Sequence, residues 1–209
     1  AEETWENLIL RWYDYQFKGI DDGIGTEPGV KLFILGANEW TFENEWPIKR
    51  AETVPLYLHS NGSANTPFGD GSLSYDQPSG ENPDSYSYDP HDPVMSVMDI
   101  DAQPMPRDQK PLDGRQDVLV YQTEPFEKPT RFIGPVDFEL WAASDALDTD
   151  WTAKLVVVEP SGLAVNLTYG IMRARYRDGF DKEKLLDPDV TNKYVIHMNP
   201  VGIELQPGQ

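Results

Sequence analysis

The stretch VDFELWAASDALDTDWTAKLVVVEPSGLAVNLTYGIMRARYR, from Val136 to Arg177, decides the fold class. Its opening residues alternate between apolar side chains and polar or bulky ones. This period of two is typical of a strand with one buried face and one more solvent-exposed face. The apolar runs that follow are equally short, rich in β-branched residues and bounded by Asp, Gly or Pro. The four residues EPSG between two of these runs predict a hairpin turn.

Similar strand-length segments lie on both sides of this stretch, and long connections separate them. Repeated prolines between positions 83 and 111 exclude a helix there, because each proline removes a backbone donor and disfavours helical geometry before it. Many short strands joined by long loops predict an all-β fold, a β-sandwich of jelly-roll type. The expected strands cover residues 30–36, 54–60, 117–123, 136–144, 153–159, 163–168, 171–177 and 193–199.

The N-terminal stretch is different and predicts a helix. Trp5, Leu8, Ile9 and Trp12 are spaced i, i+3, i+4 and i+7, which places them on one face of a helix. Gly19 is a suitable residue for the end of this helix. A helix with so much aromatic surface needs a large partner to cover it.

Composition excludes several classes of protein. The chain has 209 residues, 39% of them hydrophobic, so it is long enough for a core and too apolar for a disordered chain. The sequence contains no run of 18 apolar residues, so it predicts no membrane-spanning helix. The formal net charge of −19 would repel nucleic acid. The absence of cysteine excludes disulfides and thiolate sites.

Sequence motifs for chemistry are scarce. There is no G-x-S-x-G elbow, phosphate-binding glycine loop or H-E-x-x-H motif. The three histidines, His59, His91 and His197, are isolated in the sequence. We expect His59 and His197 to be half-buried strand residues and His91 to lie in an exposed turn. A triad formed from Ser144, His197 and a loop aspartate remains an open alternative, because such triads assemble in space in any chain order.

The acidic loop SDALDTD allows two interpretations. Asp145, Asp148 and Asp150 are oxygen donors of the kind that Ca²⁺ prefers, so they form a weak candidate metal site. Aspartate side chains also stabilise turns by accepting hydrogen bonds from nearby backbone donors. Because the loop lacks the glycine and terminal glutamate of an EF-hand, the structural interpretation is preferred, and no cofactor is expected.

Two further groups of side chains allow a binding interpretation beside a structural one. Tryptophans stack on sugar rings, but they also pack in cores and domain contacts. Arginines that alternate along a strand bind anions, but they also pair with acidic surfaces. The structural interpretation is preferred for both, and a glycan-binding module remains an alternative function. The residues are Trp40, Trp46, Trp141 and Trp151, and Arg173, Arg175 and Arg177.

Several longer stretches together resemble the CocE/NonD hydrolases, a family of serine hydrolases that includes cocaine esterase, α-amino-acid ester hydrolases and X-Pro dipeptidyl-peptidases. The central stretch SDALDTDWTAKLVVVEPSGLAVNLTYGIMRARYRDG is similar to their C-terminal non-catalytic jelly-roll domain, which is galactose-binding-like. The opening WENLILRWYDYQFKG resembles the helix that leads out of their α/β-hydrolase domain. The other matching stretches are VKLFILGANEWTFENEWP, DPHDPV and LDGRQDVLVYQTEPFEKPTRFIGPV.

This resemblance implies a division of the chain and a role for each part. Residues 1–29 would be the helix and linker from the end of the hydrolase domain, and residues 30–209 would be the sandwich, lacking its last strands. The catalytic serine, aspartate and histidine of the family would lie before Ala1, so no catalytic residue is assigned here. The chain would then be the middle-to-late part of a longer polypeptide, and a periplasmic or secreted location is slightly favoured.

The resemblance also implies the partner and the contact residues. The partner would be the α/β-hydrolase catalytic domain of the same polypeptide, contacted by the helix face Trp5, Leu8, Ile9 and Trp12. The segment after DPHDPV would approach the active site and help to form the acyl pocket through Val94, Met95, Val97 and Met98. A homo-oligomer formed through this domain is a further alternative.

Overall fold

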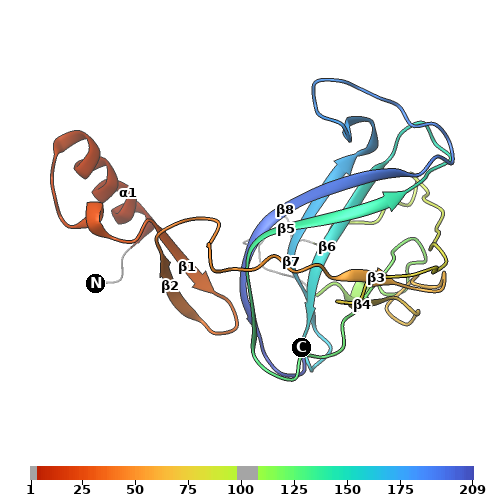
Figure 1. Ribbon diagram of the computed structural model, residues 1–209, viewed down its shortest axis with the longest axis horizontal. Coiled ribbons are helices and arrows are strands. Elements are labelled where there is room, and N and C mark those ends of the chain that lie inside the picture. The colour runs from red at the N-terminus through yellow and green to blue at the C-terminus, as the bar shows by residue number, and fades with distance from the viewer. Residues whose placement is uncertain (1–3, 98–107) are drawn as a thin grey trace.

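The computed structural model describes residues 4–97 and 108–209. Strands predominate, with a single α-helix at the N-terminal end (Figure 1), so the expected all-β class is confirmed. No helix in these two ranges is long and apolar enough to cross a membrane. Short 3₁₀ turns lie at Ile24–Thr26, Lys110–Leu112 and Ala174–Tyr176.

The two longest strands form an antiparallel ladder. β5 (Thr130–Ala142) pairs with β8 (Asn192–Leu205) along nearly its whole length, and the register shifts between Gly134 and Val136. Such a bulge bends a strand and increases its twist. The two strands curve together across the molecule (Figure 1). Both are longer than the sequence pattern indicated, because residues beyond the strictly alternating part still find ladder partners.

A second antiparallel ladder is formed by β6 (Asp150–Val158) and β7 (Ala164–Arg173). The predicted turn EPSG joins them, and the Gly162 N–H donates to the Glu159 carbonyl at 2.7 Å. The predicted strands at 163–168 and 171–177 are one strand that ends at Arg173. It ends there because the next backbone donors leave the ladder: the Ala174 N–H donates to the Thr149 carbonyl, and the Arg175 N–H donates to the Asp148 carboxylate.

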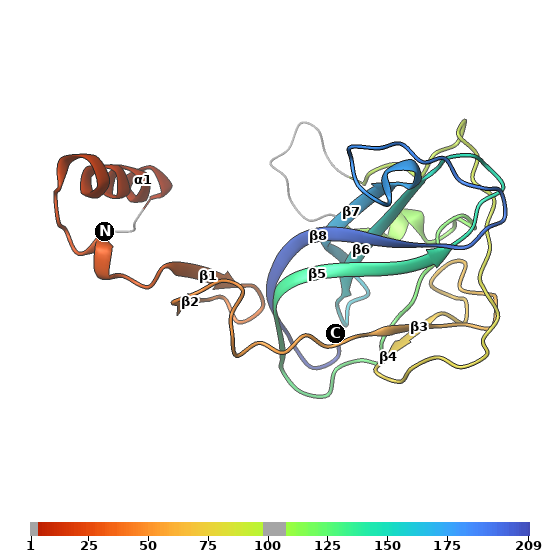
Figure 2. The same cartoon turned by 45° about the horizontal axis from the view of Figure 1, so that its top comes forward.

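The core lies between these two ladders. One cluster contains Val157, Ile203 and Leu205, and the other contains Ala174, Leu186 and Tyr194. Both views show β5 and β8 lying across β6 and β7 (Figure 2). The Thr168 hydroxyl, buried in β7, donates to the Asn199 carbonyl at 3.0 Å and so ties β7 to the β8 side of the core.

Two short hairpins extend the structure. β1 (Val30–Ile34) pairs with β2 (Glu39–Glu43), and β3 (Tyr57–His59) pairs with β4 (Ser72–Ser74). The first hairpin is attached to β8 at Leu35, whose N–H donates to Gly202 and whose carbonyl accepts from Glu204. The expected strand at 117–123 is wrong: its backbone makes only isolated bridges, from Leu119 to Asn65 in a loop and from Gln122 to Ser72 of β4.

The N-terminal helix α1 (Trp5–Tyr13) is confirmed. The Thr4 hydroxyl caps it by accepting from the Asn7 N–H at 3.3 Å. One π-helical turn (Asp14–Lys18) follows, and Gly19 ends it in a left-handed conformation with φ 66°. The helix and the β1–β2 hairpin lie together to one side of the long ladders (Figure 2).

Gly170 lies where β7 packs closely against β8 and provides a test of this packing. A Cβ at Gly170 would lie 2.7 Å from Cγ2 of Ile196 and 2.8 Å from the His197 carbonyl oxygen. We expect Gly170→Ala to lower the free energy of unfolding by about 1–3 kcal/mol through overpacking. Urea denaturation measures this. Gly114→Ala is the control, because its Cβ would meet nothing within 4 Å; equal losses in the two variants would contradict the packing described.

Candidate functional site

The most extensive candidate site is an apolar surface on the N-terminal part of the chain. No residue of α1 is buried. Of the predicted interface residues, Trp5 is 71% exposed, Trp12 is 50% exposed and Ile9 is exposed as well, whereas Leu8 is half-buried. The structure therefore places the predicted face on one helix and leaves most of it open to solvent. Large exposed apolar patches mark contact surfaces.

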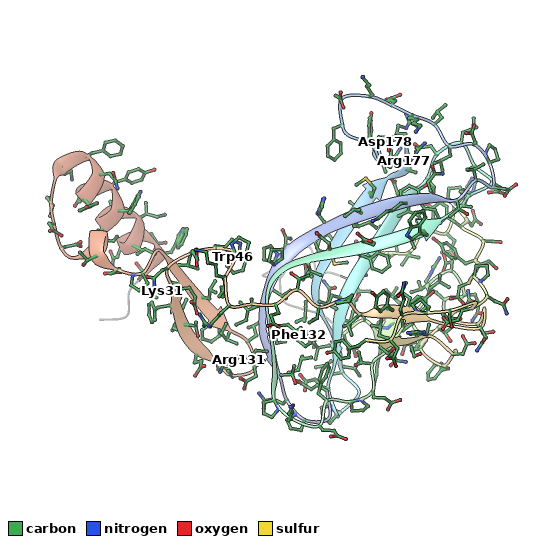
Figure 3. The ribbon with its side chains drawn as sticks, viewed as in Figure 1. Lys31, Trp46, Arg131, Phe132, Arg177 and Asp178 are labelled. Carbon is green, nitrogen blue, oxygen red and sulfur yellow. The ribbon has the colours of Figure 1, made fainter. Side chains whose placement is uncertain are left out.

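A groove beside the first hairpin is a second apolar feature. It has a volume of about 320 Å³ and lies where β1 meets the bend of β8. Trp46 lies between the hairpin and the long ladder, as Figure 3 shows. On the hairpin, the Phe33 and Trp40 rings meet edge to face at 5.3 Å, and the Lys31 ammonium lies 5.1 Å from the Trp40 ring. The groove is lined by Val30, Leu32, Phe33, Trp46, Pro200, Val201 and Gly202.

The predicted pocket segment lies away from this groove, in the long connection after β4. Met95 is exposed, whereas Val94 and Val97 are half-buried. Met98 lies outside the described residues. The segment has neither helix nor strand around these positions, so side-chain contacts determine its path.

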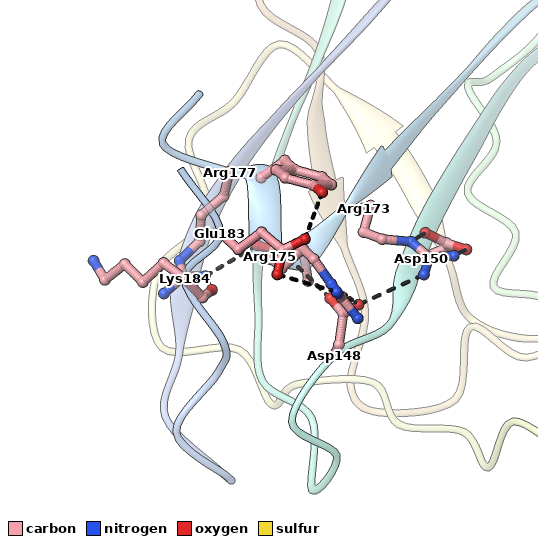
Figure 4. A network of polar contacts seen from close by, with 9 residues as sticks. Asp148, Asp150, Arg173, Arg175, Arg177, Glu183 and Lys184 are labelled. Atoms are coloured by element: carbon pink, nitrogen blue, oxygen red, sulfur yellow. Dashed lines mark hydrogen bonds and ion pairs between the residues drawn. The ribbon is translucent and has the colours of Figure 1, made fainter. Parts of the chain in front are cut away.

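The acidic loop and the arginine-rich strand end form a single charge network (Figure 4). The Asp148 carboxylate accepts from the Arg175 backbone N–H at 2.9 Å and from Arg175 Nε at 2.6 Å. The Arg173 guanidinium donates to both oxygens of Asp150, at 2.8 and 2.6 Å. Burial alone would raise the pKa of Asp148, but the hydrogen bonds and charge of Arg175 outweigh it and hold that pKa below its ordinary value.

This network supports the structural interpretation of the loop. Asp148 and Asp150 each have an arginine partner, and Asp145 does not join them in a cluster. In the part of the chain that the structure describes, no three carboxylate or imidazole groups are arranged to hold a metal ion. Two of the three arginines in turn have acidic partners: Arg173 pairs with Asp150, and Arg175 pairs with Asp148 and Glu183. Arg177 instead donates to the backbone carbonyls of Ala174 and Lys184, at 3.0 and 2.6 Å.

A serine, a histidine and a carboxylate lie in line on the β3–β4 hairpin, and sequence reasoning missed this. The Ser74 hydroxyl is 3.0 Å from His59 Nε2, and His59 Nδ1 is 2.7 Å from Glu81 Oε1. The strand pairing brings positions 59 and 74 together, and Glu81 follows from the next loop. No motif or spacing in the sequence signals this arrangement.

The hydrogen bonds around His59 oppose a catalytic role. Nε2 also lies 3.0 Å from the Asp76 carbonyl oxygen, which can only accept a hydrogen bond, so Nε2 carries a hydrogen and is not free to take a proton from Ser74. The Ser74 hydroxyl accepts from the Asp76 N–H at 3.1 Å. The hydrogen bond to Glu81 raises the pKa of His59 and favours the doubly protonated ring, which donates from both nitrogens. This is the pattern of a structural ion pair.

The alternative triad of Ser144 and His197 is wrong. His197 pairs with Asp137 across the β5–β8 ladder, and Ser144 lies seven residues farther along the β5 direction. At about 3.3 Å per residue the two are roughly 20 Å apart. The expectation that His197 is half-buried is also wrong, because it is on the outer face of the ladder and is exposed, with Nδ1 2.7 Å from Asp137 Oδ1. His91 lies in an exposed turn, as expected.

The tryptophans named as candidate sugar platforms have different environments. Trp141 is 68% exposed on β5. Trp151 is half-buried and packs against Tyr194 in the core, with ring centroids 5.6 Å apart. Trp151 is therefore a core residue and not a platform.

Comparison with known proteins places this structure in a family. Residues 22–209 match the X-Pro dipeptidyl-peptidase C-terminal non-catalytic domain. The chain belongs to that family. It is 37% identical over 201 residues to cocaine esterase of Rhodococcus sp. (strain MB1 Bresler), and the match covers 94% of this chain and 35% of that protein. The resemblance to the C-terminal domain of CocE/NonD hydrolases is confirmed.

Solved structures agree with this assignment. An α-amino acid ester hydrolase superposes with a TM-score of 0.77 at 26% identity, over 95% of this chain and 35% of that one. An aminopeptidase from a marine sediment archaeon, Thaumarchaeota archaeon, gives a TM-score of 0.75 at 27% identity, over 97% of this chain and 35% of that one. This non-catalytic domain thus spans about a third of the length of the proteins it matches.

The His59–Glu81 pair provides a test of the structural interpretation. Its hydrogen bond raises the pKa of His59 above 6.5 and lowers that of Glu81 below 4.5. The stability that the pair contributes is therefore fully present between these two ordinary values. It is lost as pH rises through the pKa of folded His59, and as pH falls through that of folded Glu81.

We expect His59→Gln to lower the melting temperature most at pH 5–6 and progressively less at higher pH. Thermal unfolding of the wild type and the variant across pH measures this. His197→Gln, at an exposed pair, is the control and should have a smaller effect. Loss of ester hydrolysis by the full-length protein on Ser74→Ala would contradict the structural interpretation.

Proposed function

We propose that this chain is the companion β domain of a serine hydrolase of the ester- or amide-cleaving type. It packs on the α/β-hydrolase domain of the same polypeptide and helps to form the wall of its acyl pocket. The observation that carries the proposal is the exposed aromatic face of α1 on a domain that spans 35% of its relatives' length. A surface of this kind is costly in water unless a partner covers it.

The printed names of the relatives support the reaction class. One is a cocaine esterase and another an α-amino acid ester hydrolase. In the proposed full-length protein, a serine in the catalytic domain attacks the acyl carbon, a histidine takes its proton, and an aspartate orients the histidine. The bond from the acyl carbon to the leaving alcohol or amine breaks, the histidine gives its proton to that leaving group, and water then hydrolyses the acyl-enzyme. In this proposal the domain described here supplies no group that forms or breaks bonds.

The proposal includes the finer architecture and the domain boundary. Residues 1–29 are the helix and linker from the hydrolase domain, and residues 30–209 are a jelly-roll, galactose-binding-like sandwich. The two facing ladders β5–β8 and β6–β7, with the core between them, support this arrangement. The attachment of the first hairpin to β8 at Leu35 supports a boundary just before β1.

The helix face provides the first test. In the full-length protein we expect Trp5→Ala and Trp12→Ala each to lower the free energy of unfolding by about 3–5 kcal/mol, because the proposed interface buries both side chains. Chemical denaturation of the full-length protein measures this. Phe180→Ala is the matched control, since Phe180 is an exposed aromatic on a loop far from α1 in the sequence. If the tryptophan variants lose no more free energy of unfolding than the Phe180 variant, the proposed interface is wrong.

The acyl pocket provides the second test. We expect Met95→Ala in the full-length protein to change the ratio of kcat/KM between p-nitrophenyl esters of long and short acyl chains by about tenfold, through lost contact with the larger group. Steady-state kinetics over a series of acyl chain lengths measures this. Leu147→Ala removes a similarly exposed aliphatic side chain from the β5–β6 loop and serves as the control. An unchanged ratio would show that Met95 does not line the acyl pocket.

A further inference from the structure

The segment that carries the proposed pocket residues lacks the usual means of holding a chain in place. Between β4 and Val97 there is no helix or strand, only bends at residues 75–76 and at Gly80 and a short turn near His91. Such a segment has no ladder of backbone hydrogen bonds to fix its position. Its path is determined by side chains that reach it from other parts of the domain.

The side chains of Asp84 and Asn65 hold the beginning of this segment. The Asp84 carboxylate accepts from the Ser60 hydroxyl at 2.7 Å, from the Ala64 N–H at 2.8 Å and from the Tyr121 hydroxyl at 2.7 Å. Asn65 donates from its amide nitrogen to the Ser85 carbonyl at 3.1 Å and to the Gln116 carbonyl at 2.7 Å. These contacts fix the segment up to about residue 85.

A single arginine holds the segment farther along. Arg115 donates from Nη2 to the Asp92 carbonyl at 2.6 Å and from Nη1 to Asp92 Oδ1 at 3.2 Å. It also donates from Nε and Nη2 to the two oxygens of Asp117, at 2.8 and 2.7 Å. Hydrogen bonds to Asp117 and Asp92, in that order of importance, raise the pKa of Arg115. The side chain of Arg115 is 22% exposed and that of Asp117 is 12% exposed.

The geometry gives each part of the guanidinium a separate role. The two bonds to Asp117 fix the plane of the fork, because a bidentate pair allows little rotation. The remaining donors then determine the position of the Asp92 backbone. Val94 follows only two residues later, and Met95 after it, so the position of Asp92 largely determines where these two side chains lie.

We propose that Arg115 is a positioning residue for acyl selectivity in the full-length enzyme. It acts through Asp92 and contacts no reacting atom. The inference rests on the proposed function, since it requires that the segment 94–97 lines the acyl pocket. Displacements of about 1 Å at groups distant from the chemistry can change rates by about a hundredfold. A small displacement of the Asp92 backbone is therefore sufficient to alter selectivity.

The surroundings of Arg115 permit a clean substitution. The side chain borders an open depression of about 640 Å³, formed by the loops around Tyr86 and Asp92 and by residues 114–117. A shorter side chain at position 115 leaves no closed cavity there, so the domain is expected to fold. Arg115→Lys keeps the charge but replaces the planar fork by a single ammonium, which cannot hold Asp117 and Asp92 in the same geometry.

The experiment measures kcat and KM of the full-length protein for p-nitrophenyl esters of graded acyl length. We expect Arg115→Lys and Arg115→Gln each to change the long-to-short ratio of kcat/KM by about 3- to 10-fold, in the direction of Met95→Ala. Hydrogen exchange of peptides covering residues 84–97 should become faster in both variants. Arg173→Gln is the matched control: it breaks a bidentate pair of the same geometry, with Asp150, and should change neither quantity.

The possible outcomes separate this inference from the function on which it rests. If Met95→Ala changes selectivity and the Arg115 variants do not, the positioning role is wrong and the pocket assignment stands. If neither changes selectivity, the pocket assignment fails and the positioning role fails with it. If Arg115→Gln does not fold, the acyl selectivity and hydrogen exchange of Arg115→Lys test the positioning role. A loss of activity that is equal for all acyl groups, with unchanged exchange of residues 84–97, would also overturn the positioning role.

Discussion

The long antiparallel pairing of β5 with β8 is the interaction on which the rest of this domain depends. It places Tyr194 and Ile196, among the most deeply buried side chains, over the β6–β7 ladder. The first hairpin is hydrogen-bonded to the same strand at Gly202 and Glu204. A slip of one residue in this register would turn the buried face of β8 outward and displace the hairpin as well. The ladder therefore fixes the core and the position of the N-terminal surface together.

Arginine–carboxylate pairs fix the position of segments that the two long ladders do not hold. With a formal net charge of −19, carboxylates greatly outnumber cations, and several arginines each join two segments. Arg131 contacts Glu39 and Glu204, and so connects the first hairpin to β8. Arg115 connects the turn at Asp92 to Asp117 in the same way. Planar bidentate pairs suit this task because they fix direction as well as distance.

The apolar surface of α1 and the first hairpin connects the structure to its proposed role. The two core clusters of the ladders contain no residue of α1 or of this hairpin, and both elements lie to one side of the ladders (Figures 1 and 2). The matched proteins are about three times as long as this chain. A covering domain earlier in the same polypeptide is therefore a simple explanation for an aromatic helix that no residue of the described domain buries.

The sequence by itself determined the elements with strong periodicity. The helix at Trp5–Tyr13 and the strands around Val136 and Ala153 follow from regular spacing of apolar residues, a local property. Long stretches with resemblance to known hydrolases determined the family, which the match over residues 22–209 confirmed.

Only the tertiary structure decided how distant side chains combine. It ended β7 at Arg173, because the Thr149 carbonyl and the Asp148 carboxylate accept from the next two backbone donors, and it reduced the expected strand at 117–123 to isolated bridges. It also placed the side chains of Ser74, His59 and Glu81 in a row, and it hydrogen-bonded His59 Nε2 to the Asp76 carbonyl. Local periodicity records which face of an element is buried. Which polar group reaches which partner depends on the path of loops that carry no periodic signal.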